Sequence, residues 1–466
     1  MLHYPSSYNH YTFTHALNAC TLAHNFPPKG LEIHAHVIKN GHFHDLFIQN
    51  ALLHFYVTQH DVFSAHKVFD SINYPDVVSW SSLISGFSKC GFFNEAIDLF
   101  LDMTVRPNCI TLVSVMSACC GLRSLKLGKA VHGYCLRNVD GFNIVWGNAM
   151  LDFYVRCGSI LAAKYLFVKM PKRDVVSWSI LIGGYAERGY CEEAIRVFQE
   201  MVKSKEAEPN EATILNALSA CSSISSLSLG QFVHGYINTK ADLLVSIVVM
   251  NSLTNMYVKC GEIGMAIEVF NKIKYKDAIS WSTIINGLAL TGLAKQALQL
   301  FSLIHVNGIL PDGVTFIGVL SACSHGGLVA QGLMVFKAMW RIHKIVPKME
   351  HCACIVDMYG RAGLLEEAEA VIREMCVDGQ EKEEGLIWGA LLNACRNHGN
   401  EEMFDRIKQE VENVKGVRVG TFALLSNTYV SFDRWDEANK VRDEMRVMGL
   451  KKKAGCSWIE VNPSIS

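Results

Sequence analysis

Small polar side chains recur at two fixed places along this chain. The first place directly follows a position that is tryptophan in three of six cases, and it holds Asn50, Ser81, Asn148, Ser179, Asn251 and Ser282. The second place ends the same repeated unit, and it holds Asp76, Asn108, Asp174, Asn210, Asp277 and Asp312. An amide both donates and accepts hydrogen bonds, a hydroxyl does either, and a carboxylate accepts. Such groups at regular intervals on one rigid face suit the reading of unpaired RNA bases along their Watson–Crick edges.

Two plainer interpretations compete with base reading. An aspartate at the end of one unit is also a good N-cap for the helix that begins the next. A serine or asparagine beside a buried tryptophan can simply face solvent. The residues alone leave these alternatives open.

The elements that would position these side chains are themselves repeated. The stretches "DVVSWSSLISGF", "DVVSWSILIGGY" and "DAISWSTIINGL" begin at Asp76, Asp174 and Asp277, which gives a period of about a hundred residues made of smaller units. Alanine and phenylalanine follow each tryptophan at fixed distances, as Ala96, Phe100, Ala194, Phe198, Ala297 and Phe301. The cysteines of "SAC" return with the same period, which favours small buried core residues; they are Cys119, Cys221 and Cys323, with Cys20 before them.

Each unit has the pattern of two helices. Asp76 is placed to cap the first helix, Gly91 to end it, and Asn94 to cap the second. One face of the first helix carries Trp80, Leu83, Ile84 and Phe87. Two short helices cannot bury such stripes alone, whereas stacked neighbours can. The sequence therefore predicts an all-α fold, a solenoid of tandem helix-turn-helix repeats.

The units follow one another with almost no gap. Eleven repeats are expected at 10–45, 46–76, 77–108, 109–143, 144–174, 175–210, 211–246, 247–277, 278–312, 313–348 and 349–383. Two diverged helical pairs follow at 384–451, and a tail at 452–466 ends the chain. Residues 1–9 have the character of an incomplete repeat.

These motifs resemble the plant pentatricopeptide repeat family, in its PLS subclass and E subgroup. "FIQNALLHFYVTQHDVFSAHKVFD" and "NALSACSSISSLSLGQFVHGYI" are similar to short and long repeats of that subclass. "WGALLNACRNHGN" and "LLSNTYVSFDRWDEANKVRDEM" followed by "GCSWIEV" are similar to its E extension. The resemblance covers residues 10 to about 461 and implies a right-handed superhelical α-solenoid. It also implies binding of single-stranded organellar RNA, and most members specify cytidines for conversion to uridine.

The resemblance gives roles to particular residues. The two polar places match those with which the family selects a base: Asn with Asp favours U, Ser with Asn favours A, and Ser with Asp favours G. The inferred element is 5′-U-A-n-U-A-n-U-G, because long repeats carry aliphatic Val113, Leu215 and Ile317 at the first place, with Thr14 and Asp45 a possible exception. Side chains that would sandwich bases are Phe47, Val78, Val145, Val176, Val248 and Ile279, although ordinary helix packing explains them equally well from sequence.

The chain is expected to recognise a site without performing chemistry there. Hydrolytic deamination of cytidine uses an H-x-E motif followed by P-C-x-x-C. No histidine of this chain is followed two places later by glutamate, and no two cysteines have the C-x-x-C spacing. We therefore expect no enzymatic activity and no cofactor. A deaminase-bearing pentatricopeptide protein and accessory editing factors would dock on residues 384–466.

Two further groups could do chemistry. His351, Cys352 and Cys354 resemble metal ligands, but they fall within a repeat helix and lack the usual two-residue gap of zinc cysteines, so no metal site is expected. The basic run 451–453 is more typical of a solvated helix end than of a phosphate contact.

Composition and charge limit which other classes of function and location the sequence supports. The net charge is −1 and 19% of residues are charged, which gives no global argument for a polyanion partner, although a local basic stripe is compatible with it. No apolar run approaches the length of about 18 residues that suggests a membrane span. The first 20 residues contain no Lys or Arg, so no targeting peptide is visible; the resemblance alone implies a mitochondrial location, or alternatively a chloroplast one. The rival functions are a factor for RNA stability, splicing or processing, and a protein-binding helical scaffold.

Overall fold

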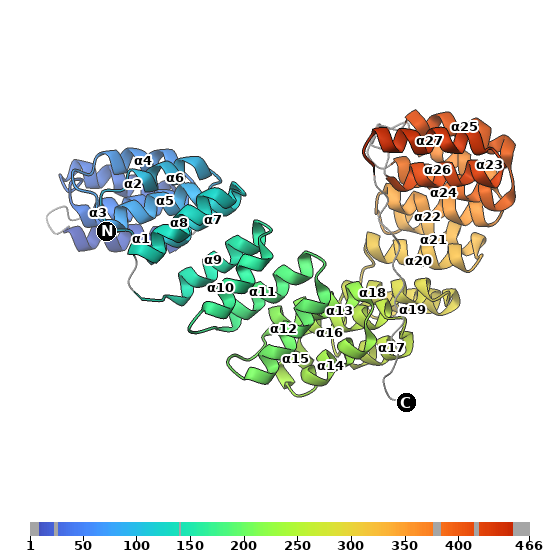
Figure 1. Ribbon diagram of the computed structural model, residues 1–466, viewed down its shortest axis with the longest axis horizontal. Coiled ribbons are helices and arrows are strands. Elements are labelled where there is room, and N and C mark those ends of the chain that lie inside the picture. Colours follow the sequence, from blue (N-terminus) through green and yellow to red (C-terminus); the bar gives the residue numbers. More distant parts are fainter. Residues whose placement is uncertain (1–8, 23–26, 139–140, 376–383, 414–418, 451–466) are drawn as a thin grey trace. The chain divides into compact units, whose positions relative to one another are not determined.

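The computed structural model describes residues 9–22, 27–138, 141–375, 384–413 and 419–450, which form 27 helices and no strand. The chain divides into two compact units, residues 1–220 and 221–466, each described by itself below (Figure 1). Of the expected incomplete repeat at 1–9 only Asn9 is described. The tail 452–466 and the basic run 451–453 lie outside the described residues.

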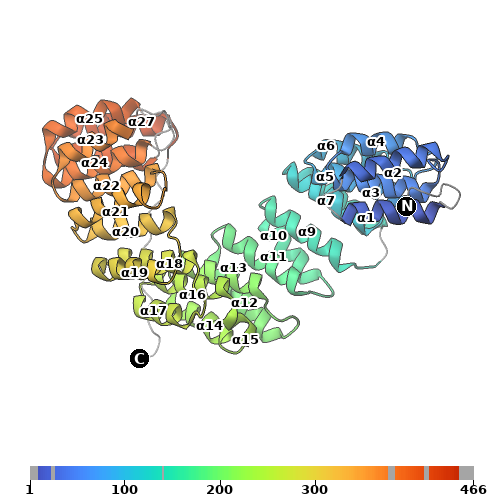
Figure 2. The same cartoon turned by 180° about the vertical axis from the view of Figure 1, so that it is seen from behind.

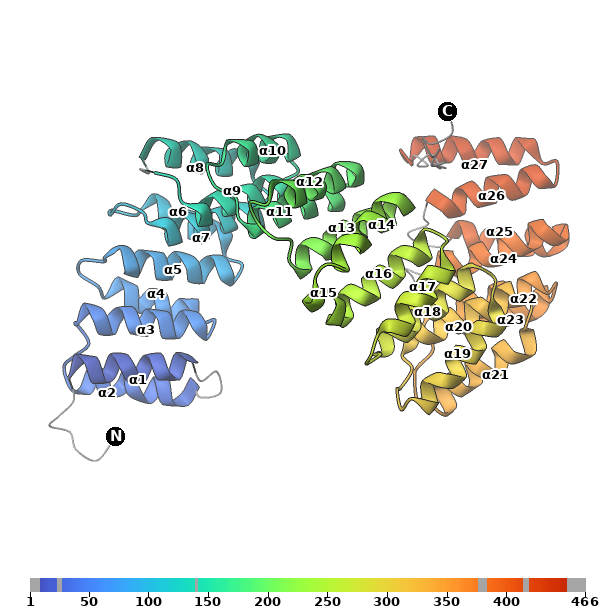
Figure 3. The ribbon, with the colours of Figure 1, turned by 90° about the horizontal axis from the view of Figure 1, so that it is seen from below.

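In the first unit, helices follow one another in antiparallel pairs. They are α1(His10–Leu22), α2(Pro27–Lys39), α3(Leu46–Thr58), α4(Val62–Asp70), α5(Val77–Lys89), α6(Phe93–Leu101), α7(Cys109–Gly121), α8(Leu125–Asn138), α9(Ile144–Arg156), α10(Ile160–Lys169), α11(Val175–Glu187), α12(Cys191–Ser204) and the start of α13(Glu211–Ile224). The first helices of successive pairs, α1, α3, α5, α7, α9 and α11, pack side by side. Figure 3 shows α1, α3 and α5 as successive layers of this stack.

The second unit continues with the same pairing. Its helices are the end of α13, α14(Leu227–Ile237), α15(Ala241–Val245), α16(Ile247–Lys259), α17(Ile263–Lys272), α18(Ala278–Leu290), α19(Ala294–Val306), α20(Gly313–His325), α21(Val329–Arg341), α22(Met349–Arg361), α23(Leu365–Met375), α24(Glu384–His398), α25(Glu401–Asn413), α26(Val419–Ser431) and α27(Trp435–Val447). From α16 to α26 the first helices again form a continuous stack; Figure 2 shows α22 and α24 as neighbouring layers.

The predicted all-α solenoid of tandem helix pairs is confirmed in each unit. The short helix α15 was not expected from the pattern. No helix within the described ranges is both long and apolar enough to cross a membrane.

The repeated tryptophans join one helix pair to the next. Three first-helix tryptophans, one in each repeated stretch, meet the ring of a phenylalanine on the preceding second helix in an edge-on arrangement. The pairs are Phe69 with Trp80, Phe167 with Trp178 and Phe270 with Trp281, at centroid distances of 4.7, 4.7 and 5.1 Å. Such a ring pair contributes about 0.5–1.5 kcal/mol beyond the burial of its area. The repeated twelve-residue stretch therefore forms the same interface between successive helix pairs three times.

The predicted start of α5 is confirmed, whereas the predicted start of α6 is wrong. Asp76 is the N-cap of α5, and its carboxylate accepts from the backbone N–H groups of Val78 and Ser79. Helix α6 begins at Phe93, after Phe92, which makes no side-chain cap bond. Asn94 therefore lies inside the first turn, because the buried contact of Ala96 and the turn at Gly91 set the helix start without a polar cap.

Small residues occupy the closest approaches within each layer. The alanines after each tryptophan, Ala96, Ala194 and Ala297, are fully buried. Of the repeated cysteines, Cys119, Cys221 and Cys323 are also fully buried, while Cys20 is half-buried. Burial raises the pKa of Cys119 and of Cys323 to about 11, so these two remain neutral thiols at neutral pH.

Repeated histidines also pack within the solenoid. Each pairs with a tyrosine hydroxyl through Nδ1, and burial lowers the pKa of each histidine. A neutral ring has one donor and one acceptor nitrogen, and its tautomer sets which role Nδ1 takes toward the hydroxyl. The pairs are His34 with Tyr56, His132 with Tyr154 and His234 with Tyr257, at 2.6, 2.8 and 2.7 Å.

A glycine on the second helix of each long repeat admits a bulky side chain from the next layer. At Gly128 of α8, an added Cβ would lie 2.0 Å from the Phe153 ring. The same place recurs as Gly30 against Phe55, Gly230 against Met256 and Gly332 against Met358. These four glycine positions thus have no room for a side chain, because a bulky residue of the next layer fills the space.

We expect Gly128→Ala to lower the free energy of unfolding, although alanine is the better helix former. Forcing a methyl group into a packed core costs about 1–3 kcal/mol, which exceeds the gain of about 1 kcal/mol from helix propensity. Gly133→Ala on the same helix is the matched control, because its Cβ would meet only the flexible end of Arg137 at 3.5 Å. Urea denaturation of both variants checks the prediction, and equal stability of the two would contradict it.

Candidate nucleic-acid interface

Asparagine and aspartate at the two polar places lie in direct contact in the first unit. Asn148 Nδ2 donates to Asp174 Oδ1 at 3.0 Å. Ser177 Oγ lies 2.6 Å from Asn148 Oδ1 and 2.9 Å from Asp174 Oδ1, where it donates its proton to one of them. These contacts fix the orientation of the amide. The same three contacts, at 3.2, 2.6 and 2.9 Å, join Asn50, Asp76 and Ser79.

The corresponding set in the second unit is less complete. Asn251 Nδ2 donates to Asp277 Oδ1 at 3.1 Å, and Ser280 Oγ donates to the same oxygen at 2.8 Å. The buried Asn251 Oδ1 has no hydrogen-bond partner among the residues that the structure describes. The amide oxygen of this layer is therefore held less firmly than that of Asn148.

The three aspartates are ionised acceptors. Burial alone would raise the pKa of Asp174, but hydrogen bonds from Ser177 and from the Asn148 amide outweigh it and lower that pKa. The same balance lowers the pKa of Asp76 and of Asp277. The bonds described above all use Oδ1. The carboxylate thus caps a helix and orients an amide with one oxygen, so helix capping and the reading interpretation are compatible.

Serine and asparagine meet through a neighbouring threonine. Ser81 Oγ lies 3.3 Å from Asn108 Oδ1 and 2.7 Å from Thr111 Oγ1. Ser179 Oγ lies 2.7 Å from Thr213 Oγ1, which in turn donates to Asn210 Oδ1 at 2.8 Å. The threonine hydroxyl therefore links the two polar places in both layers, and in the layer of Ser81 it does so beside the direct contact with Asn108.

The last pair is not joined in this way. Ser282 Oγ donates to the backbone oxygen of Ile279 at 3.1 Å, and Asp312 accepts from Thr315 Oγ1 at 2.7 Å. Thr14, the possible exception in the first long repeat, likewise donates to its own helix at His10 O, while Asp45 caps α3. The aliphatic residues at the first place of the later long repeats are half-buried; they are Val113, Leu215 and Ile317.

The sequence pattern missed the hydroxyl residues of these clusters. Each stands three residues after the aspartate or asparagine of the second place and is almost wholly buried; they are Ser79, Thr111, Ser177, Thr213, Ser280 and Thr315. Thr111, Ser177 and Ser280 also complete a reciprocal capping box with the second polar place, although the usual residue at this third helical position is Glu or Gln. Their contact with a residue about thirty positions earlier needs the packed layers.

The residues expected to sandwich bases are exposed. Their exposed fractions run from 48% to 70%, for Phe47, Val78, Val145, Val176, Val248 and Ile279. Large apolar side chains this exposed contribute little to the core, so ordinary helix packing does not account for them. The row extends to places the sequence reasoning left out: Tyr11, Ile110 and Val314 are exposed at 63%, 63% and 52%.

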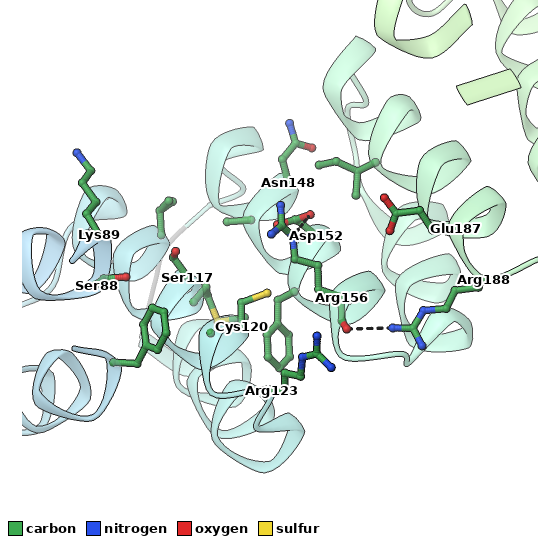
Figure 4. Close-up of a pocket in the computed structure, with 17 residues that line it drawn as sticks. Ser88, Lys89, Ser117, Cys120, Arg123, Asn148, Asp152, Arg156, Glu187 and Arg188 are labelled. Atoms are coloured by element: carbon green, nitrogen blue, oxygen red, sulfur yellow. Dashed lines mark hydrogen bonds and ion pairs between the residues drawn. The ribbon is translucent and has the colours of Figure 1, made fainter. Parts of the chain in front are cut away.

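A pocket of about 1210 Å³ lies beside Asn148 in the first unit, between α5, α7, α9 and α11 (Figure 4). Its lining includes four cations, Lys89, Arg123, Arg156 and Arg188, and the two carboxylates Asp152 and Glu187. Arg156 and Asp152 form an ion pair at 2.9 Å. The excess of positive charge suits a phosphate backbone. Lys89 and Arg156 each directly precede a Cys-Gly dipeptide.

The metal-like residues have structural partners. His351 Nδ1 accepts from the backbone N–H of Lys348 at 3.0 Å, and its Nε2 donates to Gly313 O at 3.0 Å. Cys352 is fully buried, and Cys354 lies 3.3 Å from Ser321 Oγ. Within the described residues, no group of three or more His, Cys, Asp or Glu is placed to hold a metal ion.

Three sequence models match parts of the chain. The PPR repeat family matches residues 75–121 and 173–223, and the single PPR repeat matches 148–175, 248–277, 279–309 and 352–380. The E motif matches residues 398–460.

Curated proteins of Arabidopsis thaliana are similar over nearly the whole chain. A chloroplastic pentatricopeptide repeat-containing protein is 37% identical over 97% of this chain and 65% of its own length. A second pentatricopeptide repeat-containing protein is 36% identical over 93% and 77%, and a mitochondrial one is 34% identical over 96% and 70%. The chain thus spans just under two thirds of the first of these relatives.

The crystal structure of the pentatricopeptide repeat protein PPR10 from maize is 17% identical with a TM-score of 0.46, covering 96% of this chain and 80% of that one.

Proposed function

Because the chain belongs to the pentatricopeptide repeat family, we propose that it binds single-stranded RNA and reads its sequence. The observation that carries this proposal is the recurring polar pair, hydrogen-bonded in four of six layers, next to a row of exposed apolar side chains. A base inserted between two such side chains would present its Watson–Crick edge to the polar pair.

The chemistry of the asparagine layers is compatible with uracil, the base that the family's pairing rule assigns to them. With Nδ2 committed through one hydrogen to Asp174, Asn148 retains one N–H donor and one lone pair on Oδ1. Uracil offers an N3–H donor beside a carbonyl acceptor, which complements this arrangement. We infer the element 5′-U-A-n-U-A-n-U-G, read in order from Asn50 with Asp76 to Ser282 with Asp312. The cations around the pocket beside Asn148 would neutralise the phosphates of the strand.

We further propose that the protein marks a cytidine for conversion to uridine. The matched E motif supports this role, and the sequence given contains neither H-x-E nor C-x-x-C, the motifs of the zinc deaminases. A deaminase carried by another pentatricopeptide protein, with accessory editing factors, would therefore supply the chemistry through residues 384–466. The names of the relatives favour an organelle. We propose the mitochondrion, with the chloroplast as the alternative that a fluorescent fusion tests.

The element should bind more tightly than a shuffled RNA of the same composition, by at least about tenfold, because one well-placed base contact already gives about 1–3 kcal/mol of discrimination. Filter binding at physiological salt measures both affinities. Equal affinities would overturn sequence reading, while failure to bind any RNA would favour a protein-binding scaffold.

A further inference from the structure

A buried hydroxyl residue from the following repeat accompanies each polar pair. In six consecutive polar layers the third residue of the next first helix is Ser or Thr, with exposed fractions of 0–1%; these are Ser79, Thr111, Ser177, Thr213, Ser280 and Thr315. A capping role alone needs contact only with the preceding aspartate or asparagine. In four layers the hydroxyl also lies within hydrogen-bond distance of the first polar place, on the previous helix pair.

The hydroxyl adds a second contact to the asparagine amide, on its oxygen side. In the layer of Asn148 it stands 2.6 Å from Oδ1, while Nδ2 is held by Asp174 at 3.0 Å. A flipped amide would place its oxygen against the carboxylate and lose the bond to Asp174, and Ser177 Oγ would have to change from donor to acceptor toward the amide. The carboxylate alone constrains only Nδ2. With both partners in place, one donor and one lone pair remain for a ligand.

The choice between serine and threonine at the hydroxyl position correlates with the residue at the first polar place. Serine follows in all three layers with asparagine at the first place, and threonine follows in all three layers with serine there. Thr111 reaches Ser81, and Thr213 reaches Ser179, both at 2.7 Å. The longer amide is thus paired with the smaller hydroxyl residue, and the short hydroxyl with the larger one.

We propose that this Ser or Thr is the third member of each reading unit, a positioning residue that orients the base-selecting side chain on the previous repeat. This inference rests on the proposed reading of RNA. It makes selection of one base depend on three residues from two successive repeats. The hydroxyl itself is buried, so it acts through its neighbour and not by touching the base.

The layer of Asn251 provides an internal comparison. There Ser280 bonds Asp277, and Asn251 Oδ1 has no partner among the described residues. Loss of this hydroxyl should therefore change base selection less than loss of Ser177.

The test measures the affinities of full-length variants for the element and for three versions changed only at its fourth nucleotide, the one assigned to Asn148. We expect Ser177→Ala to weaken the preference for U there by about fivefold, the worth of one hydrogen bond. Preferences at the other nucleotides should persist, and Ser177→Thr, which keeps the hydroxyl, should retain more of the preference than Ser177→Ala. Ser114→Ala is the matched control, since Ser114 is a buried first-helix serine that donates only to its own helix, at Ile110 O.

If Ser177→Ala fails to fold, Thr111→Val gives a second test, because valine keeps nearly the shape of threonine and lacks its hydroxyl. Its preference for A at the second nucleotide should fall by a similar factor. An unchanged preference at the assigned nucleotide, or an equal loss for every RNA, would overturn the inference and leave RNA reading intact. A wild-type protein that binds the element and its altered versions equally would overturn the proposed reading itself, and the inference with it.

Discussion

Removal of residues 384–466 should reduce cytidine-to-uridine conversion to background in a reaction that contains the element, a downstream cytidine and a separate deaminase. The residues proposed to read bases all lie between Asn50 and Asp312, so we expect RNA binding to survive the removal. Purified full-length protein with zinc but without the deaminase should convert nothing. Sequencing of the reaction products measures conversion, and filter binding of the same preparations measures affinity. Conversion by the protein alone, or by the deletion variant with the deaminase, would contradict the assignment.

The structure also shows that this deletion cuts through a shared core. One hydrophobic cluster runs from Met349 and Val356 through Leu391 and Phe404 to Val441. Without α24–α27, the inner faces of α22 and α23 lose their cover, so the truncated protein is expected to be less stable. Affinity for RNA must therefore be measured on the folded fraction.

Substitutions in the full-length chain avoid the loss of stability that the deletion causes. Trp435 and Met448, in and directly after α27, are 54% and 59% exposed. We expect Trp435→Glu with Met448→Glu to lower conversion while leaving RNA affinity unchanged, because both side chains lie outside the core and within the matched E motif. Leu161→Glu on α10, at a position exposed by 80%, is the matched control.

Exchange of one polar pair should change one base of the target. Asn251→Ser with Asp277→Asn recreates the pair found at Ser81 and Asn108, and the preference at the seventh nucleotide should move from U to A. Since each preference is worth about 1–3 kcal/mol, the ratio of the two affinities should change by roughly a hundredfold. Binding to RNAs altered at each nucleotide in turn checks that the other preferences stay in place.

The same layer tests whether the pair acts alone. Addition of Ser280→Thr to the double variant completes the set seen at Thr111, and it should increase the preference for A. Unfolding in urea provides the control, because aspartate and asparagine cap a helix about equally well. A uniform loss of affinity for all RNAs would show that these residues support the solenoid and do not select a base.

Periodicity made the helices and the two polar places predictable. The spacing of Trp80, Leu83, Ile84 and Phe87 recurs in enough units to identify one buried face, and all four are buried. Local cues were less reliable. Asn94 has the right residue type for a cap, but packing of Ala96 starts the helix earlier. The preferences of a single residue are weaker than the packing of a whole face.

Contacts between layers were beyond the sequence pattern. Ser177 meets Asn148 across 29 residues of chain, and only the stacking of α9 on α11 brings them together. The Gly128 contact with Phe153 has the same origin. The sequence also could not distinguish a capping aspartate from one that orients an asparagine, because Asp174 does both with a single oxygen atom.

That dual role has an evolutionary consequence. A mutation from aspartate to asparagine at the end of a repeat alters the hydrogen-bonding character shown to a base, yet it keeps an N-cap of equal quality. Under the proposed reading of RNA, specificity can therefore change one nucleotide at a time without passing through poorly folded intermediates. A lineage of such proteins can therefore acquire new target transcripts through substitutions that have little effect on folding.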